Sequence, residues 1–327
     1  MYSHSGGDNP GYHQVVGGVD ELQVQSVYWR CVFGFFASSH RHNKDAIHLL
    51  FANQPPPKIL DGQDTGKLVA DFSIQLVNFP TITRPPKDYY TSWNSQFLLL
   101  DVIDALNVML EEGEISPDHV CMVLDSDCIF NRSLGGEFEE DVRRYGALLY
   151  TIDYDYDHNI NGLCLRELEL LSSEYGGVEV HPFRYCGGEF FCALASEIPS
   201  IAREARIAYA ISLDRFNRGE KKFNEEAHLL SYVYHKLGYP SHTANRYIKR
   251  LWTNSRYFRN VLKTDMDLTV WHLPDQKQDG MLKYFARLSS ENILDSYSLA
   301  RIFRIQQSWM RTCVGRSIKW FHTKYTL

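Results

Sequence analysis

The chain has 327 residues, of which 44% are hydrophobic and 23% are charged, so its composition is that of a globular protein and excludes wholesale disorder. It carries 34 Lys and Arg against 40 Asp and Glu, a formal net charge of −6. Because an acidic body repels phosphates, this balance argues against nucleic acid as a partner.

The cysteines and the hydropathy pattern bear on the compartment. The seven cysteines show no paired C-x-x-C spacing, which predicts neither a disulfide framework nor a zinc finger. No run of eighteen apolar residues occurs, and residues 1–5 lack the basic and apolar segments of a secretory signal. These features indicate a cytoplasmic protein.

Helical and strand patterns alternate along the first part of the chain. Apolar residues at helical spacing predict a helix, and short apolar runs before turn residues predict buried strands. The expected elements are a helix over 22–36, a strand over 46–52, a helix over 66–72, a strand over 74–79, a helix over 89–112 and a strand over 120–124. This order predicts a parallel, doubly wound α/β sheet.

The pattern is looser in the second part of the chain. It predicts strands over 147–152, 188–193 and 268–273, helices over 198–211 and 224–237, and a basic helix from residue 295. The expected fold class is therefore α/β, with a Rossmann-like, mostly parallel sheet and a C-terminal helical appendage. We expect residues 1–132 and 133–285 to be two halves of one domain, followed by a segment over 286–327.

An acidic pair follows the most apolar of the predicted strands. Asp125 and Asp127 come directly after Val120–Leu124, whereas the other Asp-x-Asp triplets of the chain do not follow such a run. Ligands of α/β sheets gather at the carboxyl ends of the strands, and carboxylate oxygens suit Mg²⁺ or Mn²⁺. The alternative is a solvated turn in which the acidic residues cap the next segment.

The segment VCMVLDSDCIF resembles the metal-binding Asp-x-Asp strand of GT-A glycosyltransferases, which use nucleotide-sugar donors. The resemblance implies a GT-A fold in which residues 1–132 bind the nucleotide sugar and residues 133–285 bind the acceptor and carry catalysis. It also implies that Asp125, Ser126 and Asp127 bind the donor diphosphate through Mn²⁺ or Mg²⁺, which stabilises the charge that develops on the leaving group.

The segment FRYCGGEFFC resembles the small-residue strand that lies under the donor and acceptor sugars in these enzymes. Gly187 and Gly188 would let a pyranose approach the backbone, because glycine has no Cβ. The resemblance makes Glu189 a candidate for a carboxylate that faces the sugar.

The segment NEEAHLL resembles the Asp-Glu-Ser-His-Leu segment of the retaining blood-group and α-galactosyltransferase family. Glu226 aligns with that family's proposed nucleophile and His228 with the following histidine, whereas Glu225 and Ala227 replace Asp and Ser. A carboxylate beneath the anomeric carbon can stabilise an oxocarbenium ion or attack it. The alternative is that both glutamates occupy the first turn of a helix, where they complement its dipole.

A late histidine completes the metal site in several GT-A families. His272 resembles it by its place in the chain and by its position at the end of a predicted strand. Imidazole can bind Mn²⁺, so His272 is a candidate third metal ligand. The alternative is a structural histidine, since the chain has thirteen.

The C-terminal segment carries six basic residues from Arg301 to Lys324 and no acidic residue, which leaves −12 for the rest of the chain. A basic amphipathic helix with tryptophans binds an anionic membrane surface, which would place the protein at the inner face of a membrane near lipid-linked acceptors. The alternative is a helix packed on the acidic body with its charges solvated.

The sequence therefore predicts a metal-dependent hexosyltransferase that moves a hexose from a nucleotide diphosphate sugar, most simply a UDP-sugar, to a saccharide or a lipid-linked saccharide. Glu226 slightly favours retention of the anomeric configuration, with an inverting enzyme as the alternative. A sugar-phosphate nucleotidyltransferase shares the sheet and the metal, but Gly17 and Gly18 are a poor substitute for its glycine-rich phosphate loop. A non-catalytic carbohydrate- or nucleotide-binding module is the third alternative.

Overall fold

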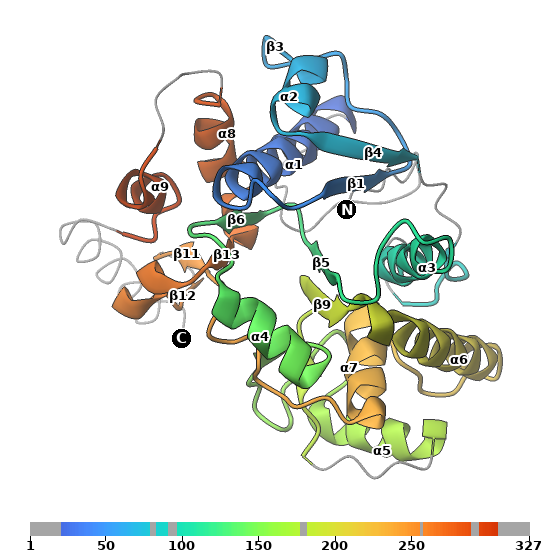
Figure 1. Ribbon diagram of the computed structural model, residues 1–327. Coiled ribbons are helices and arrows are strands. Elements are labelled where there is room, and N and C mark those ends of the chain that lie inside the picture. The colour runs from blue at the N-terminus through green and yellow to red at the C-terminus, as the bar shows by residue number, and fades with distance from the viewer. Residues whose placement is uncertain are drawn as a thin grey trace, which may run out of the picture.

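The computed structural model describes residues 21–78, 83–90, 97–176, 182–255, 258–288 and 294–306. The protein is a mixed α/β structure in which helices surround small parallel and antiparallel sheets (Figure 1). Within these ranges, no helix combines the length and apolar character that a membrane crossing requires.

The N-terminal part begins with the long helix α1 and a parallel pair of strands, β1 and β4, as predicted. Helix α1 continues beyond residue 36 to a last turn of three basic residues, which complement the negative end of the helix dipole. Asp64 caps α2 by accepting a hydrogen bond from the Lys67 N–H at 3.2 Å. The bounds are α1 Glu21–His42, β1 His48–Ala52, β2 Ile59–Leu60, β3 Gln63–Asp64, α2 Thr65–Asp71 and β4 Ile74–Asn78.

The predicted helix over 89–112 is shorter in the structure, where α3 spans Leu98–Glu111. Tyr89 instead belongs to a loop, and its hydroxyl donates a hydrogen bond to the carbonyl of Phe223 at 2.8 Å. Helix α6 (Ile198–Asn217) packs against both α3 and α7 (Glu226–Leu237), and the three helices contribute nearly half of the buried residues of the largest hydrophobic core (Figure 1). Helix α7 ends as predicted, because Gly238 adopts the left-handed conformation that stops it.

Strand β5 (Val120–Leu124) has the predicted bounds, but in the described residues it pairs antiparallel with β9 (Phe190–Leu194) and not with β1 or β4. The predicted parallel pairing is therefore found between β1 and β4, but it does not continue to β5. The predicted strand over 147–152 is only Thr151–Ile152, β7, paired with β8 (Tyr185–Cys186).

A second sheet positions the C-terminal end of the predicted site. Strand β13 (Val270–His272) lies between β10 (Ile248–Arg250), which is parallel to it, and β6 (Cys128–Phe130), which is antiparallel. This register sets His272 opposite both Arg250 and Cys128.

The remaining elements cover the edges of these sheets. Helix α1 packs against β6 and α8, so that the first helix and the late strands share one region of the molecule (Figure 1). The predicted basic helix appears as the short α9, and residues 307–327 lie outside the described residues. The bounds are α4 Gly136–Tyr145, α5 Leu165–Gly176, β11 Thr253–Asn254, β12 Phe258–Arg259, α8 Gly280–Phe285 and α9 Ser296–Ile302.

Candidate metal centre

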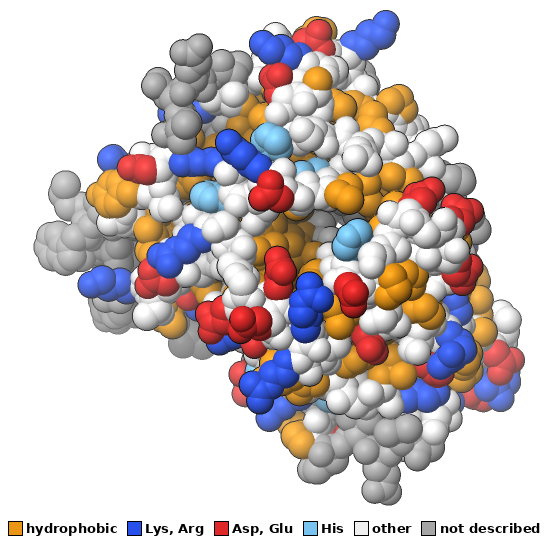
Figure 2. All heavy atoms as spheres, in the orientation of Figure 1, with side chains coloured by type: hydrophobic (Ala, Val, Ile, Leu, Met, Phe, Trp, Pro, Cys, Tyr) orange, Lys and Arg blue, Asp and Glu red, His pale blue; other side chains and the backbone are white. Residues whose placement is uncertain are grey.

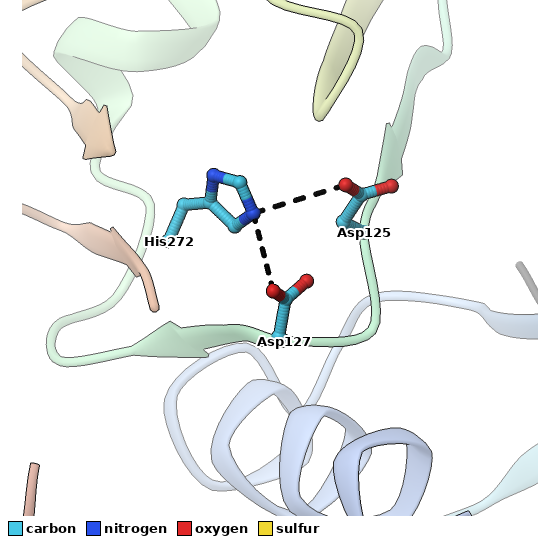
Figure 3. Close-up of side chains that lie close together, drawn as sticks. All are labelled: Asp125, Asp127 and His272. Atoms are coloured by element: carbon cyan, nitrogen blue, oxygen red, sulfur yellow. Dashed lines mark ion pairs between the residues drawn. The ribbon is translucent and has the colours of Figure 1, made fainter. Parts of the chain in front are cut away.

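The three predicted metal ligands meet at one point of the fold. Asp125 and Asp127 lie in the turn between β5 and β6, and His272 is the last residue of β13 (Figure 3). The Leu273 N–H donates to the carbonyl of Asp127 at 3.0 Å, which joins the end of β13 to this turn. One ligand atom from each of the three side chains lies within 4.8 Å of the others, an arrangement that could hold a metal ion.

The spacing and the chemistry of these atoms fit Mn²⁺ or Mg²⁺. Nε2 of His272 lies 3.3 Å from Oδ2 of Asp127 and 3.8 Å from Oδ2 of Asp125. In an octahedral site with bonds of about 2.1 Å, neighbouring ligand atoms are about 3 Å apart, so small movements would let these three atoms act as ligands of one ion, with the other positions left to water or a bound ligand. Asp127 and His272 are buried, whereas the Asp125 side chain is 43% exposed, which gives the site an open side.

Cationic side chains compensate the carboxylates in this metal-free arrangement. Nζ of Lys277 lies 2.5 Å from Oδ2 of Asp127. Burial alone would raise the pKa of Asp127, but the charges of Lys277 and His272 outweigh it and hold that pKa far below its ordinary value. Burial likewise opposes the charged form of His272, but Asp127 and Glu189 raise its pKa to about 9. A metal ion would have to displace the proton from His272.

Asp125 has the opposite electrostatic environment. Although part of its side chain faces solvent, the surrounding protein desolvates the carboxyl group, and this desolvation, followed by the charge of Asp127, raises the pKa of Asp125 to about 6. A divalent cation between Asp125 and Asp127 would remove the repulsion between the two carboxylates. Ser126 lies half-buried between them.

Glu189, predicted from the sequence to face the sugar, has both of its oxygens engaged. Arg250 donates from Nε to Oε1 at 2.8 Å and from Nη2 to Oε2 at 2.5 Å, and Nδ1 of His272 lies 3.1 Å from Oε1. Burial would raise the pKa of Glu189, but the charges of Arg250 and His272 lower it well below the ordinary value. In this structure Glu189 is an internal counterion behind the candidate metal centre.

Gly187 and Gly188 leave room for two carboxylates. A Cβ added to Gly187 would lie 2.3 Å from Oε2 of Glu189, and one added to Gly188 would lie 3.1 Å from Oε1 of Glu226. The structure therefore brings Glu226, at the start of α7, next to the turn that carries Glu189. An approach of a pyranose to this backbone stays a prediction.

Glu226 differs from its neighbour Glu225 in its contacts. Glu225 accepts hydrogen bonds from the Tyr185 hydroxyl at 2.9 Å and from Nδ2 of Asn161 at 2.5 Å, and Nε2 of the fully buried His228 lies 3.4 Å away. Among the described residues, the buried Oε2 of Glu226 has no hydrogen-bond partner. Burial, and then the charge of Glu225, raises the pKa of Glu226 well above its ordinary value.

Two residues of the centre, Arg250 and Lys277, are not predicted by the sequence. Arg250 ends the three-residue strand β10, and Lys277 follows a short helical turn after β13. Neither position belongs to a motif that sequence reasoning connects with Asp125 or Asp127. The role of Arg250 depends on the register of β10 against β13, whereas Lys277 contacts Asp127 from the turn that follows β13.

The sequence matches no protein-family model and no curated protein.

Proposed function

We propose that the protein is a metal-dependent glycosyltransferase that moves a hexose from a nucleoside diphosphate sugar, most simply a UDP-sugar, to a hydroxyl of a saccharide or lipid-linked saccharide. The observation that carries the proposal is the group of Asp125, Asp127 and His272 at the end of a buried strand, with one side open. The proposed arrangement is of the GT-A type, with residues 1–132 binding the donor and residues 133–285 binding the acceptor.

The residues of the centre would divide the work as follows. Asp125, Asp127 and His272 would hold Mn²⁺ or Mg²⁺, which when bound supplies electrostatic stabilisation to the departing diphosphate. Lys277, whose Nζ lies 2.5 Å from Oδ2 of Asp127, would place a second positive charge beside the same site. Both groups act where charge develops as the bond to the sugar breaks.

Glu226 is the carboxyl group that we propose to face the anomeric carbon, and this assignment slightly favours retention. Its Oε2 has no protein partner among the described residues, and its pKa is raised, so a ligand can decide its protonation state. The anomeric configuration of the product, measured by NMR, tests the assignment. An inverted product would remove Glu226 from the role of nucleophile.

The metal-dependent step can be tested without knowing the acceptor. Thermal unfolding is followed with UDP-, GDP- and dTDP-sugars, each with and without Mn²⁺. We expect one donor to raise the melting temperature only when Mn²⁺ is present, and Asp125→Ala to abolish that shift. Asp267→Ala is the matched control, because Asp267 belongs to another Asp-x-Asp triplet and its side chain is 72% exposed. A full shift in Asp125→Ala, or none in the wild type with any donor, would contradict the proposal.

The proposed surroundings of the enzyme are the cytoplasm and the inner face of a membrane, reached through Arg301–Lys324. Acidic and basic side chains are interspersed on the face shown in Figure 2, so that this face offers no basic patch for nucleic acid. Co-sedimentation with vesicles that contain anionic lipid tests the membrane contact. We expect binding by the whole chain and its loss when residues 307–327 are removed.

A further inference from the structure

We infer that Glu189 and Arg250 are positioning residues that fix the ring of His272 toward the metal, and that this pair sets the preference of the centre for Mn²⁺ over Mg²⁺. The inference rests on the metal centre of the proposed function. It assigns Glu189 to the support of a ligand instead of contact with the sugar.

The two ring nitrogens of His272 face different partners. Nδ1 faces Oε1 of Glu189 at 3.1 Å, whereas Nε2 faces the carboxylates of Asp127 at 3.3 Å and Asp125 at 3.8 Å. A carboxylate beside Nδ1 keeps the proton on that nitrogen and leaves the lone pair of Nε2 for a cation. Glu189 thus selects the ring orientation that a metal ion needs.

Arg250 holds the carboxylate of Glu189 in place. Arg250 grips both of its oxygens, at 2.8 and 2.5 Å, and the planar guanidinium fixes the plane of the carboxylate. The backbone of Arg250 is itself fixed. Arg250 lies opposite His272 in the β10–β13 pairing, and its backbone N–H donates to the Tyr150 hydroxyl at 2.9 Å. The side chains of Glu189 and His272 are 1% and 5% exposed, so water does not replace these contacts.

A fixed His272 ring favours the binding of Mn²⁺ over that of Mg²⁺. Imidazole binds the transition metal Mn²⁺ more readily than Mg²⁺, which prefers oxygen ligands and keeps several waters. The two aspartates serve both ions alike. If the ring is free to turn, the affinity for Mn²⁺ therefore falls more than the affinity for Mg²⁺. The ratio of the two affinities then decreases.

The primary variant is Arg250→Lys, which keeps the positive charge but removes the two-point grip on Glu189. Mn²⁺ binding is titrated by electron paramagnetic resonance, and Mg²⁺ binding is measured by displacement of Mn²⁺. We expect the affinity for Mn²⁺ to fall about 10- to 100-fold, the usual effect of losing such a support. The affinity for Mg²⁺ should fall by a clearly smaller factor.

The matched control is Arg206→Lys. Arg206 also pairs with a buried carboxylate, with Nη2 2.6 Å from Oδ1 of Asp101, but it contacts only one oxygen of that carboxylate, belongs to α6 and contacts none of the proposed ligands. We expect Mn²⁺ affinity in this variant to equal that of the wild type. A loss equal to that in Arg250→Lys would show a general structural effect and overturn the inference.

A second variant covers the case in which Arg250→Lys does not fold. Glu189→Gln combined with Arg250→Met removes both charges together, so no buried charge is left without its partner. We expect this folded double variant to show the same narrowed preference for Mn²⁺. If either folded variant binds both ions as tightly as the wild type does, only the positioning role is overturned. If the wild type itself binds no Mn²⁺, the proposed metal centre is overturned.

Discussion

Two glutamates beside the Gly187–Gly188 turn have opposite environments. Glu189 is surrounded by positive charge, with Arg250 on both oxygens and His272 on one, and its pKa is lowered. Glu226 lies beside negative charge and has a buried oxygen with no partner in the described part of the chain, and its pKa is raised. Glu189 thus has protein partners on both carboxylate oxygens, whereas Oε2 of Glu226 is available to a ligand.

This difference separates support from ligand contact. A buried carboxylate with a full set of partners contributes to the folded state and to the orientation of its neighbours. A buried carboxylate without partners costs stability, and such costs are concentrated at functional sites. The comparison therefore predicts opposite effects when the same substitution, Glu to Gln, is made at the two positions.

The largest effect is expected for Glu189→Gln. The substitution leaves the guanidinium of Arg250, whose side chain is 23% exposed, without the counter-charge of the buried Glu189. Removing one member of a buried pair costs about 3–5 kcal/mol, and the partial exposure of Arg250 places the expected loss at the lower end of that range. Urea unfolding at pH 7 measures the loss. A decrease of less than about 1 kcal/mol, the usual value for an exposed pair, would show that solvent screens this site.

The pH dependence of the metal-free protein follows from His272. Its pKa is raised to about 9, so the stability that it contributes is fully present below about pH 6.5 and is lost as the pH rises through 9. We expect the free energy of unfolding to fall between pH 7 and pH 10 in the wild type and to fall less in His272→Gln. Equal pH dependence in the two proteins would contradict the charged state assigned to His272.

The sequence predicted the local elements of the site well, because a short-range pattern determines them. The apolar run before Asp125 predicted β5 with its bounds, and the helix predicted over 224–237 ends at the residue where α7 ends. The three proposed metal ligands, which come from two distant segments, were also predicted, and the structure brings them within coordinating distance.

The sequence could not predict which strands pair. An apolar strand satisfies its backbone with either a parallel or an antiparallel neighbour, and β5 takes β9. The contacts of Glu189 were missed for the same reason, because they depend on the β10–β13 register that places Arg250 opposite His272. Charge partners across strands are decided by tertiary structure, for which one sequence gives no periodic signal.

A smaller effect of opposite sign is expected for Glu226→Gln. The raised pKa means that the protonated form of Glu226 stabilises the fold at low pH, and this contribution is lost as the pH rises through the folded-state pKa. Because glutamine stays neutral, the variant should be more stable than the wild type at pH 8, by about 1 kcal/mol, the scale of one unmade buried hydrogen bond, and equal to it at pH 4. Glu139→Gln, at an exposed i,i+4 pair, is the control and should change little.

The smallest expected change in stability, but a diagnostic one, is that of Gly188→Ala. The added methyl group would lie 3.1 Å from Oε1 of Glu226, so the carboxyl group must shift by a few tenths of an ångström. If the glycine makes room for that carboxyl group, Gly188→Ala weakens donor binding in the wild-type background and has no further effect in Glu226→Ala, where the space is empty. If the glycine instead lets a sugar approach the backbone, the methyl group weakens donor binding equally in both backgrounds. A double-mutant cycle on the Kd of the donor therefore distinguishes the two roles.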